Sequence, residues 1–441
     1  MKILRLLPIL ILACAAMFAQ SNVAPDVTII HAGKLIDGHS NQPLTNQAIL
    51  VQGNRIISVS DEAATPAIQG AKEIDLRNAT VLPGLIDTHT HMFLQGEDEK
   101  LGGYDIQLLK FSQSYRAARA TVSARRALEQ GFTTIRDMET EGAGYGDVGI
   151  RQAVNEGWIP GPRIITTTRA ISTTGGYPLE GYAPEIEPVL PRGVQMVDGP
   201  VEARKAAREQ MSNGADWIKV YMTHRSWTDK QGHLVSQPTL TLEEIKAITD
   251  EAHGWHRKVA CHSYGGEGLQ RALDGGCDSI EHGLDITDAQ IAQMKRQGTW
   301  YVPTLAIYYL DNADPNTDEG KRDKARWSVH EVSFKKAMAA GVKIAFGTDV
   351  GGFDWKQSIA QEFPVMVRLG MSPMDAIKCA TGHAAELLDM EGQVGTIAPG
   401  AYADIVAVNG DPLAHIDILE NVQFVMKNGT VYKSGGQWQT R

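Results

Sequence analysis

Long hydrophobic runs, clusters of basic residues and cysteines are all scarce in this chain of 441 residues. The formal net charge is -10, from 42 Lys and Arg against 52 Asp and Glu, and no run of basic residues occurs. A protein that binds nucleic-acid phosphates needs a basic face, so the sequence argues against a nucleic-acid partner. The hydrophobic content of 43% is that of an ordinary globular protein.

The pronounced hydrophobic run lies at the N-terminus, where Lys2 and Arg5 precede an apolar segment at residues 6–18. This segment is too short to span a bilayer. A basic start, a short apolar core and the small residue Ala19 predict a signal peptide over residues 1–20, cleaved after Ala19. We therefore expect an exported mature protein, in a bacterial periplasm or secreted, without a transmembrane span.

Only four cysteines occur, and Cys14 lies within the predicted signal peptide. A lipoprotein anchored through Cys14 is an alternative, although Leu12 fits such a processing site poorly. The remaining Cys261, Cys277 and Cys379 are too few for a disulfide framework. At most one disulfide can form, and the preferred interpretation is buried thiols.

Short segments of β character at both ends of the mature chain predict a small second domain. Runs rich in Val, Ile and Thr, separated by Gly, Asn and Asp, occupy residues 24–80 and recur in residues 391–441. Such runs are typical of short antiparallel strands. We predict that the two segments together form one composite β-sandwich domain.

The central segment, residues 81–390, alternates short apolar strands with amphipathic helices, which is typical of a parallel α/β domain. The eight strand candidates are residues 85–89, 133–137, 163–167, 217–221, 259–262, 279–282, 300–305 and 343–349. Eight strand and helix units predict a closed (β/α)8 TIM barrel.

Side chains that can bind a metal fall at the ends of five of these strands. His89 and His91 project from the same face of the first strand, because side chains on a strand repeat every two residues. The others are Lys219, His262, His282 and Asp349. The C-terminal ends of barrel strands carry the active site, so we expect all six side chains to meet in one volume.

Each of these residues also has an ordinary structural interpretation. Lys219 alone would be a solvated lysine. His262 and His282 alone would be hydrogen-bonded core histidines, and Asp349 would cap a helix. These interpretations must explain five strand ends independently, whereas a metal site explains them together. Imidazole and carboxylate groups suit zinc, and Mn²⁺, Co²⁺ or Fe²⁺ accept the same donors.

Several segments resemble the amidohydrolase superfamily. The sequence Pro-Gly-Leu-Ile-Asp-Thr-His-Thr-His at 83–91 resembles its first-strand signature, Gly-Thr-Asp at 347–349 its eighth-strand signature, and residues 380–406 its C-terminal segment. Cys-His-Ser-Tyr-Gly at 261–265 and Asp-Ser-Ile-Glu-His-Gly at 278–283 are most similar to the imidazolonepropionase-related branch. That branch contains metal-dependent Xaa-Pro dipeptidases and related carboxypeptidases.

The resemblance implies that the six side chains hold two divalent cations, most simply Zn²⁺. His89, His91 and Asp349 would bind one ion, and the other two histidines would bind the second. Lys219 matches the lysine that those enzymes carry as a carbamate bridging the two ions. Water shared by two metals loses a proton near neutral pH. We hypothesise that Asp349 acts first as general base and then as general acid during attack on an amide.

Four further residues near the predicted barrel mouth are candidates for contacts with the reacting group or the substrate. Tyr264 lies two residues beyond a candidate ligand and would donate to the developing oxyanion. Tyr177, His224 and Arg225 would contact substrate, Arg225 because a guanidinium pairs with a carboxylate through two hydrogen bonds. Their ordinary alternatives are packing and solvent exposure. Many relatives have a histidine where this chain has Tyr177, so their substrate range transfers poorly.

Together these observations predict an exported, binuclear, metal-dependent amidohydrolase that acts on dipeptides or N-acyl amino acids. The alternative within enzymes is hydrolysis of a cyclic amide, a lactone or an aryl amide such as a toxin. A scaffold or binding protein that had lost catalysis would ordinarily have lost ligands, and all six positions are occupied. The expected partner is a small-molecule or dipeptide substrate, and a homo-oligomer remains open.

Overall fold

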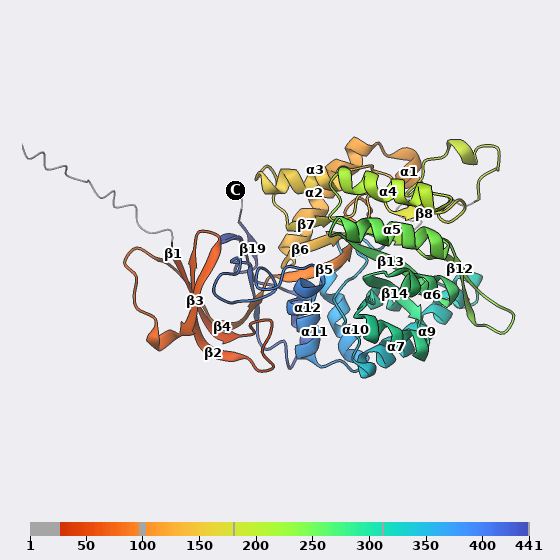
Figure 1. Cartoon of the computed structure of the whole chain (residues 1–441). Coiled ribbons are helices and arrows are strands. Elements are labelled where there is room, and N and C mark those ends of the chain that lie inside the picture. Colours follow the sequence, from red (N-terminus) through yellow and green to blue (C-terminus); the bar gives the residue numbers. More distant parts are fainter. Residues whose placement is uncertain (1–26, 97–102, 180, 311–312, 440–441) are drawn as a thin grey trace, which may run out of the picture.

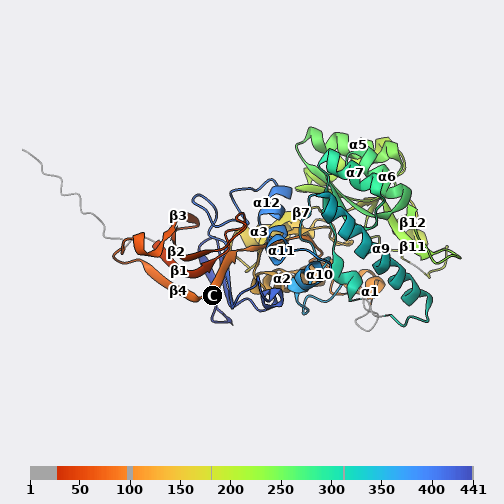
Figure 2. The same cartoon turned by 90° about the horizontal axis from the view of Figure 1, so that it is seen from below.

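The computed structural model describes residues 27–96, 103–179, 181–310 and 313–439. The predicted signal peptide, with Cys14, lies outside these residues. Figure 1 shows a small β-rich part, built from both ends of the chain, beside a larger part in which helices surround a second set of strands. The view from below in Figure 2 shows the same division, with β1–β4 at one end and α5, α6, α7 and α9 at the other.

One eight-stranded sheet contains strands from both ends of the chain. Its order is β19-β18-β17-β16-β4-β1-β2-β3. The strands are β1 (Val27–Leu35), β2 (Leu44–Gln52), β3 (Arg55–Asp61), β4 (Lys72–Pro83), β16 (Ile405–Asn409), β17 (Phe424–Lys427), β18 (Thr430–Ser434) and β19 (Gln437–Trp438). The central β4 pairs parallel with β1 and antiparallel with β16. The expectation that the two ends share one β unit is therefore confirmed.

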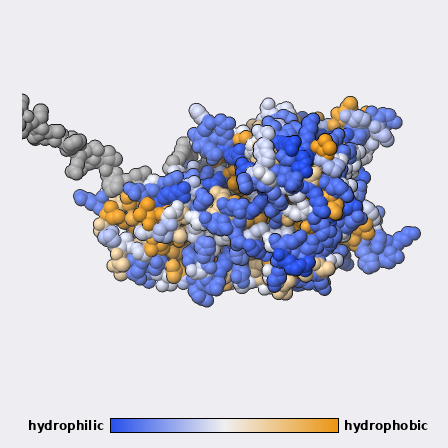
Figure 3. All heavy atoms as spheres, in the orientation of Figure 1, coloured by the Kyte–Doolittle hydropathy of each residue, from blue (hydrophilic) through white to orange (hydrophobic). Residues whose placement is uncertain are grey.

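The small sheet folds back on itself, so that its β3 edge meets the chain entering β16. The Ile56 N–H donates to the Ala401 carbonyl at 2.9 Å, and the Gly400 N–H donates to the Ile56 carbonyl at 2.8 Å. Ile30, Ile49 and other side chains form a separate apolar core inside this fold. On the face shown in Figure 3, most of the surface is hydrophilic and hydrophobic spheres gather over the small sheet.

Seven of the eight predicted barrel strands are regular parallel strands. They are β5 (Leu85–Thr90), β6 (Phe132–Asp137), β7 (Arg163–Thr166), β10 (Trp217–Tyr221), β13 (Lys258–Gly265), β14 (Ser279–Asp285) and β15 (Trp300–Val302). Neighbours pair parallel within β5-β6-β7 and within β10-β13-β14-β15. The Asp216 N–H donates to the Thr166 carbonyl at 2.8 Å and so joins β7 to β10. The short β8 (Ile171–Ser172) and β9 (Gln195–Met196) extend the sheet beside β10.

The prediction of a regular eighth strand at 343–349 is wrong, although the segment still closes the barrel. Tyr301 N–H donates to the Lys343 carbonyl at 2.8 Å on one side, and Thr88 N–H donates to the Phe346 carbonyl at 3.0 Å on the other. Asp349 has a left-handed backbone with φ of 64°. This conformation ends any extended strand at Asp349, and the segment before it forms an isolated bridge between Ile344 and Tyr301 in place of a continuous ladder.

Helices connect the strands and cover the barrel (Figure 1). They are α1 (Gly103–Lys110), α2 (Gln113–Glu129), α3 (Gly146–Asn155), α4 (Pro200–Ser212), α5 (Leu242–Gly254), α6 (Gly266–Gly275), α7 (Asp288–Gln297), α8 (Leu305–Tyr309), α9 (Asp318–Ala340), α10 (Glu362–Arg368), α11 (Pro373–Cys379) and α12 (Gly382–Leu387). A hairpin of β11 (Thr223–Thr228) and β12 (Leu234–Pro238) follows β10. Among the described residues, no helix has both the length and the apolar character needed to cross a membrane.

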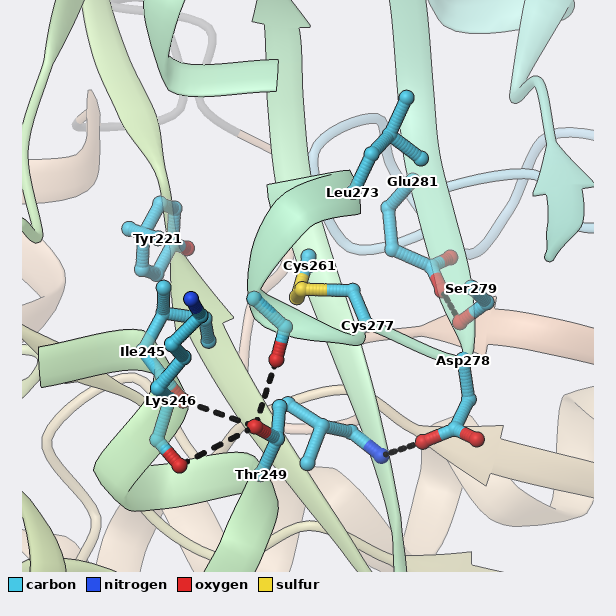
Figure 4. The surroundings of a disulfide bond; sticks show 12 residues. Tyr221, Ile245, Lys246, Thr249, Cys261, Leu273, Cys277, Asp278, Ser279 and Glu281 are labelled. Carbon is cyan, nitrogen blue, oxygen red and sulfur yellow. Dashed lines mark hydrogen bonds between the residues drawn. A yellow bond between two sulfur atoms is a disulfide. The ribbon is translucent and has the colours of Figure 1, made fainter. Parts of the chain in front are cut away.

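A disulfide joins Cys261 on β13 to Cys277, and Figure 4 shows it tying β13 to the chain that enters β14. The preference for buried thiols at these two positions is therefore wrong, whereas Cys379 is a buried free thiol. The two Cα atoms lie 6.2 Å apart, within the range that a disulfide bridges. The sequence permitted one bridge but gave no means of placing two cysteines side by side.

Replacing both Cys261 and Cys277 with alanine should lower the free energy of unfolding. Their sequence separation is 16, and closing a loop of that size in the unfolded chain stabilises the fold by about 3 kcal/mol. Urea unfolding of the oxidised wild type, the double variant and the reduced wild type measures this effect. Equal midpoints for the oxidised wild type and the double variant would contradict a stabilising bridge.

Candidate metal centre

A histidine on the first barrel strand, a second histidine just after it and an aspartate from the last barrel segment form one compact group. One candidate ligand atom from each of His89, His91 and Asp349 lies within 4.8 Å of the others. Asp349 Oδ1 is 3.1 Å from His91 Nε2 and 3.6 Å from His89 Nε2. Backbone hydrogen bonds that close the barrel hold His91, the residue after β5, beside Asp349, which has a left-handed backbone.

The two other histidines and the lysine complete the same site. His262 on β13 and His282 on β14 have ring centroids 4.4 Å apart, and the His282 ring lies 4.9 Å from that of His89. Lys219 comes from β10, which pairs with β13. All six predicted ligands line one cavity of about 950 Å³. The structure therefore brings together every side chain of the predicted metal series.

The buried ligand atoms have the properties that a cation site requires. His89 Nε2, His262 Nε2 and Lys219 Nζ are buried without a hydrogen-bond partner among the described residues. Buried polar atoms of this kind cost free energy unless a ligand satisfies them. Burial lowers the pKa of His262 and of Lys219, and it lowers that of His89 to about 4. The two imidazoles are thus held as neutral donors, which fits divalent cations, and the shift at Lys219 runs toward the neutral amine.

Outer hydrogen bonds orient two of the imidazoles toward the cavity. His89 Nδ1 lies 2.8 Å from Glu281 Oε2, and His282 Nδ1 lies 2.8 Å from Thr304 Oγ1. Partners of this kind fix the ring and leave Nε2 available for a metal. Glu281 also accepts a hydrogen bond from Arg136 at 2.9 Å. Burial acts to raise the pKa of Glu281, but Arg136 and His89 lower it to about 2.

Glu281 and Arg136 were missed in the sequence, although a signal for them was present. Each lies inside a predicted apolar strand, where an unpaired charge would be costly. Two opposite charges in two core strands indicate a buried ion pair, and both side chains are 0% exposed. The pair connects β6 to β14 across the barrel interior, and Glu281 of the pair fixes the His89 ring through its Nδ1 atom.

Backbone strain is concentrated around the site. His282 and Asp349 have left-handed φ angles of 70° and 64°, and Thr304 and Glu141 have φ angles of 48° and 50°. Residues other than glycine seldom adopt this conformation, which costs of order 1 kcal/mol or more each. The strain aims candidate ligands and their neighbours into the cavity at the carboxyl ends of the strands.

Three of the four other predicted site residues line the same cavity. Tyr264 has its ring centroid 4.6 Å from that of His262. Tyr177 and His224 also line the cavity, with ring centroids 4.2 Å apart. Arg225 is exposed and is absent from the described lining of the cavity. The structure therefore does not bring Arg225 to the site.

Arg326, from the long helix α9, lines the cavity instead. Its guanidinium lies 5.2 Å from the centroid of the Tyr264 ring and donates a hydrogen bond of 2.8 Å to Ser226 Oγ. No motif marked this residue, because the sequence of a helix does not show which barrel loops it covers.

Comparisons with known proteins agree with this geometry. Residues 80–432 match the model of the amidohydrolase family. This chain belongs to the amidohydrolase family. It is 31% identical to ochratoxinase from Aspergillus niger over 435 residues, covering 93% of this chain and 87% of the relative. It is 25% identical to imidazolonepropionase from Streptomyces avermitilis over 397 residues, covering 87% of this chain and 85% of the relative.

Among solved structures, a crystal structure of an Xaa-Pro dipeptidase with methionine bound in its active site is similar to this protein. The TM-score is 0.82 at 35% identity, and the match covers 92% of this chain and all of that chain (100%). The family and these relatives show a metal-dependent hydrolase of amide C–N bonds. The predicted superfamily, barrel fold and enzyme class are thereby confirmed.

Replacing Glu281 with glutamine should lower both stability and zinc affinity. The variant leaves Arg136 buried without a charge partner, which costs about 3 to 5 kcal/mol. Loss of the carboxylate behind His89 should weaken zinc binding about 10- to 100-fold. Urea unfolding without metal and zinc competition against a chromogenic chelator measure the two effects.

Glu267→Gln is the matched control, because Glu267 is 65% exposed and pairs with Arg271 one turn away. This substitution should cost less than about 1 kcal/mol. If Glu281→Gln behaved like Glu267→Gln in both measurements, the supporting role of Glu281 would be wrong.

Proposed function

We propose that this protein is an exported binuclear hydrolase that cleaves the amide bond of dipeptides or N-acyl amino acids. The observation that carries the proposal is the convergence of six metal-competent side chains from five barrel positions on one cavity. Four of them, His89, His91, Lys219 and His262, bear buried atoms without a hydrogen-bond partner among the described residues. Zinc is the metal that the imidazole and carboxylate donors suit best.

His89, His91 and Asp349 would hold one ion, and His262 and His282 would hold the other. Lys219 would lie between them as a carbamate, which forms from a neutral amine. Burial lowers the pKa of Lys219 and so favours that neutral form. Two bound cations would supply a nucleophilic hydroxide at neutral pH and would polarise the amide carbonyl.

Asp349 would move the proton during the reaction. Burial acts to raise the pKa of its carboxyl group, but the neighbouring histidines lower it overall, so the group is ionised. The ionised carboxylate would take the proton of the hydroxide and return it to the leaving nitrogen. Tyr264, beside His262 on the cavity wall, would donate a hydrogen bond to the developing oxyanion.

The second candidate function is hydrolysis of a bulkier aryl amide such as a toxin. The similarity to ochratoxinase over nearly the whole chain favours it. The similarity to the Xaa-Pro dipeptidase structure favours the dipeptide substrate. Turnover of dipeptides, N-acyl amino acids, cyclic amides, lactones and aryl amides under the same conditions would separate these candidates.

Export rests on the sequence of the first twenty residues and is supported by the disulfide. A bridge between Cys261 and Cys277 is the form favoured in an oxidising compartment. N-terminal sequencing of the exported protein should begin at Gln20. A lipid-modified Cys14 at the N-terminus would support the lipoprotein alternative, and retention of the whole segment in cells would contradict export.

Lys219→Ala should lose one of two bound metal ions and most of the hydrolytic turnover. Chelation should abolish turnover of the wild type, and zinc should restore it. Metal analysis by mass spectrometry and assays on an Xaa-Pro dipeptide measure both effects. Two ions retained in Lys219→Ala would contradict the bridging role, and full activity in metal-free wild type would contradict a metal-dependent reaction.

A further inference from the structure

A buried carboxylate surrounded by tyrosines forms the cavity wall beside His91. Glu141 is 2% exposed, and its Oε1 lies 3.6 Å from His91 Nδ1. The Tyr104 and Tyr177 hydroxyl groups both donate to its Oε2, at 2.9 Å and 3.2 Å. Because a carboxylate has about four acceptor positions, Glu141 retains capacity for a further donor.

Both acidic and basic side chains surround Glu141, namely Asp137 and Glu139 against Arg116 and Lys219. Glu139 is 0% exposed, accepts the Tyr221 hydroxyl at 2.7 Å, and has its other oxygen buried without a hydrogen-bond partner. Arg116 is buried nearby, but its guanidinium donates to the carbonyls of Phe93 and Thr140. Among the described residues, Glu141 has no ion pair with a lysine or arginine. A buried carboxylate without a directly paired lysine or arginine favours an added cation.

Aromatic rings complete the surroundings. The Tyr104 and Tyr177 ring centroids are 5.6 Å apart and the rings are edge to face, and the Tyr177 and Tyr221 centroids are 4.7 Å apart. Aromatic rings around an acidic group are typical of sites that bind an ammonium ion. Gly193 forms the back of this site, since a Cβ there would lie 2.1 Å from the Tyr104 hydroxyl and 3.1 Å from Glu141 Oε2.

We propose that Glu141, Tyr104 and Tyr177 form a subsite for a cationic group of the substrate, an ammonium. The inference rests on the proposed amide hydrolase and specifies its substrate class. Besides Lys219, the basic residues of the cavity are Arg322 and Arg326 of α9, which line its wall, and Arg326 faces Tyr264. An acidic side chain beside His91 and a basic one beside Tyr264 are complementary to the ammonium and the carboxylate of a zwitterionic peptide. They favour dipeptides with a free amine over N-acyl amino acids.

A purely structural role for Glu141 predicts different behaviour. If Glu141 only oriented His91, its loss would weaken turnover of all substrates to the same extent. A cation subsite instead predicts a change in the ratio between charged and uncharged substrates. That ratio separates the two roles.

The experiment compares kcat/KM for Ala-Pro, N-acetyl-Ala-Pro and N-acetyl-Lys-Pro with the zinc-loaded full-length enzyme. Wild type should prefer Ala-Pro over N-acetyl-Ala-Pro by about tenfold or more, the worth of one charge-assisted hydrogen bond. N-acetyl-Lys-Pro tests whether a side-chain ammonium can replace the α-ammonium. Glu141→Gln should reduce the preference for the cationic peptides to near one.

Glu319→Gln is the control, because Glu319 lies on the same cavity but is 67% exposed and faces Arg322 at 3.5 Å. It removes the same charge and should leave the ratio unchanged. The proposed subsite is wrong if the wild type shows no preference for the cationic peptides, or if that preference survives Glu141→Gln. It is also wrong if Glu141→Gln lowers kcat/KM for all three peptides equally. If no peptide is hydrolysed, the proposed function is wrong, and calorimetric Kd values for the same peptides decide the subsite by the same comparison.

Discussion

Closure of the barrel by a few backbone hydrogen bonds is the constraint on which the candidate metal centre depends. Asp349 N–H donates to the His89 carbonyl at 2.8 Å, and His91 N–H donates to the Val350 carbonyl at 2.7 Å. Asp87 strengthens the join by accepting the Thr348 hydroxyl at 2.5 Å. These bonds place the carboxylate from the last barrel segment beside two imidazoles from the first strand. Without them, His89, His91 and Asp349 would not share one cation site.

Around these hydrogen bonds the protein buries both neutral imidazoles and paired charges. Burial lowers the pKa of His89, His262 and His282, and the ion pair of Glu281 with Arg136 compensates the charge next to His89. The disulfide on the residue before His262 fixes β13 from its outer side (Figure 4). Left-handed backbones at His282 and Asp349 then aim both side chains inward. Fold stability and the site thus rest on the same strands.

The sequence predicted most of this arrangement, because apolar strands and polar strand ends are local features. Barrel topology brings the six candidate ligands together, although Lys219, His262 and His282 lie within β10, β13 and β14 and not at their last residues. Contacts between distant segments were not predictable in the same way. The pairing of Cys261 with Cys277, the approach of Arg326 from α9 and the tyrosines around Glu141 all depend on loop conformations and helix placement. Arg225 shows the converse, since a chemically suitable residue near a strand end proved to be exposed.

The proposed binuclear centre rests on six side chains from five barrel positions. Anomalous X-ray diffraction at the zinc edge, from crystals of the zinc-loaded protein, tests this centre. We expect two anomalous peaks, one beside His89, His91 and Asp349 and the other beside His262 and His282, with Lys219 between them. A single peak, or peaks away from these residues, would contradict it.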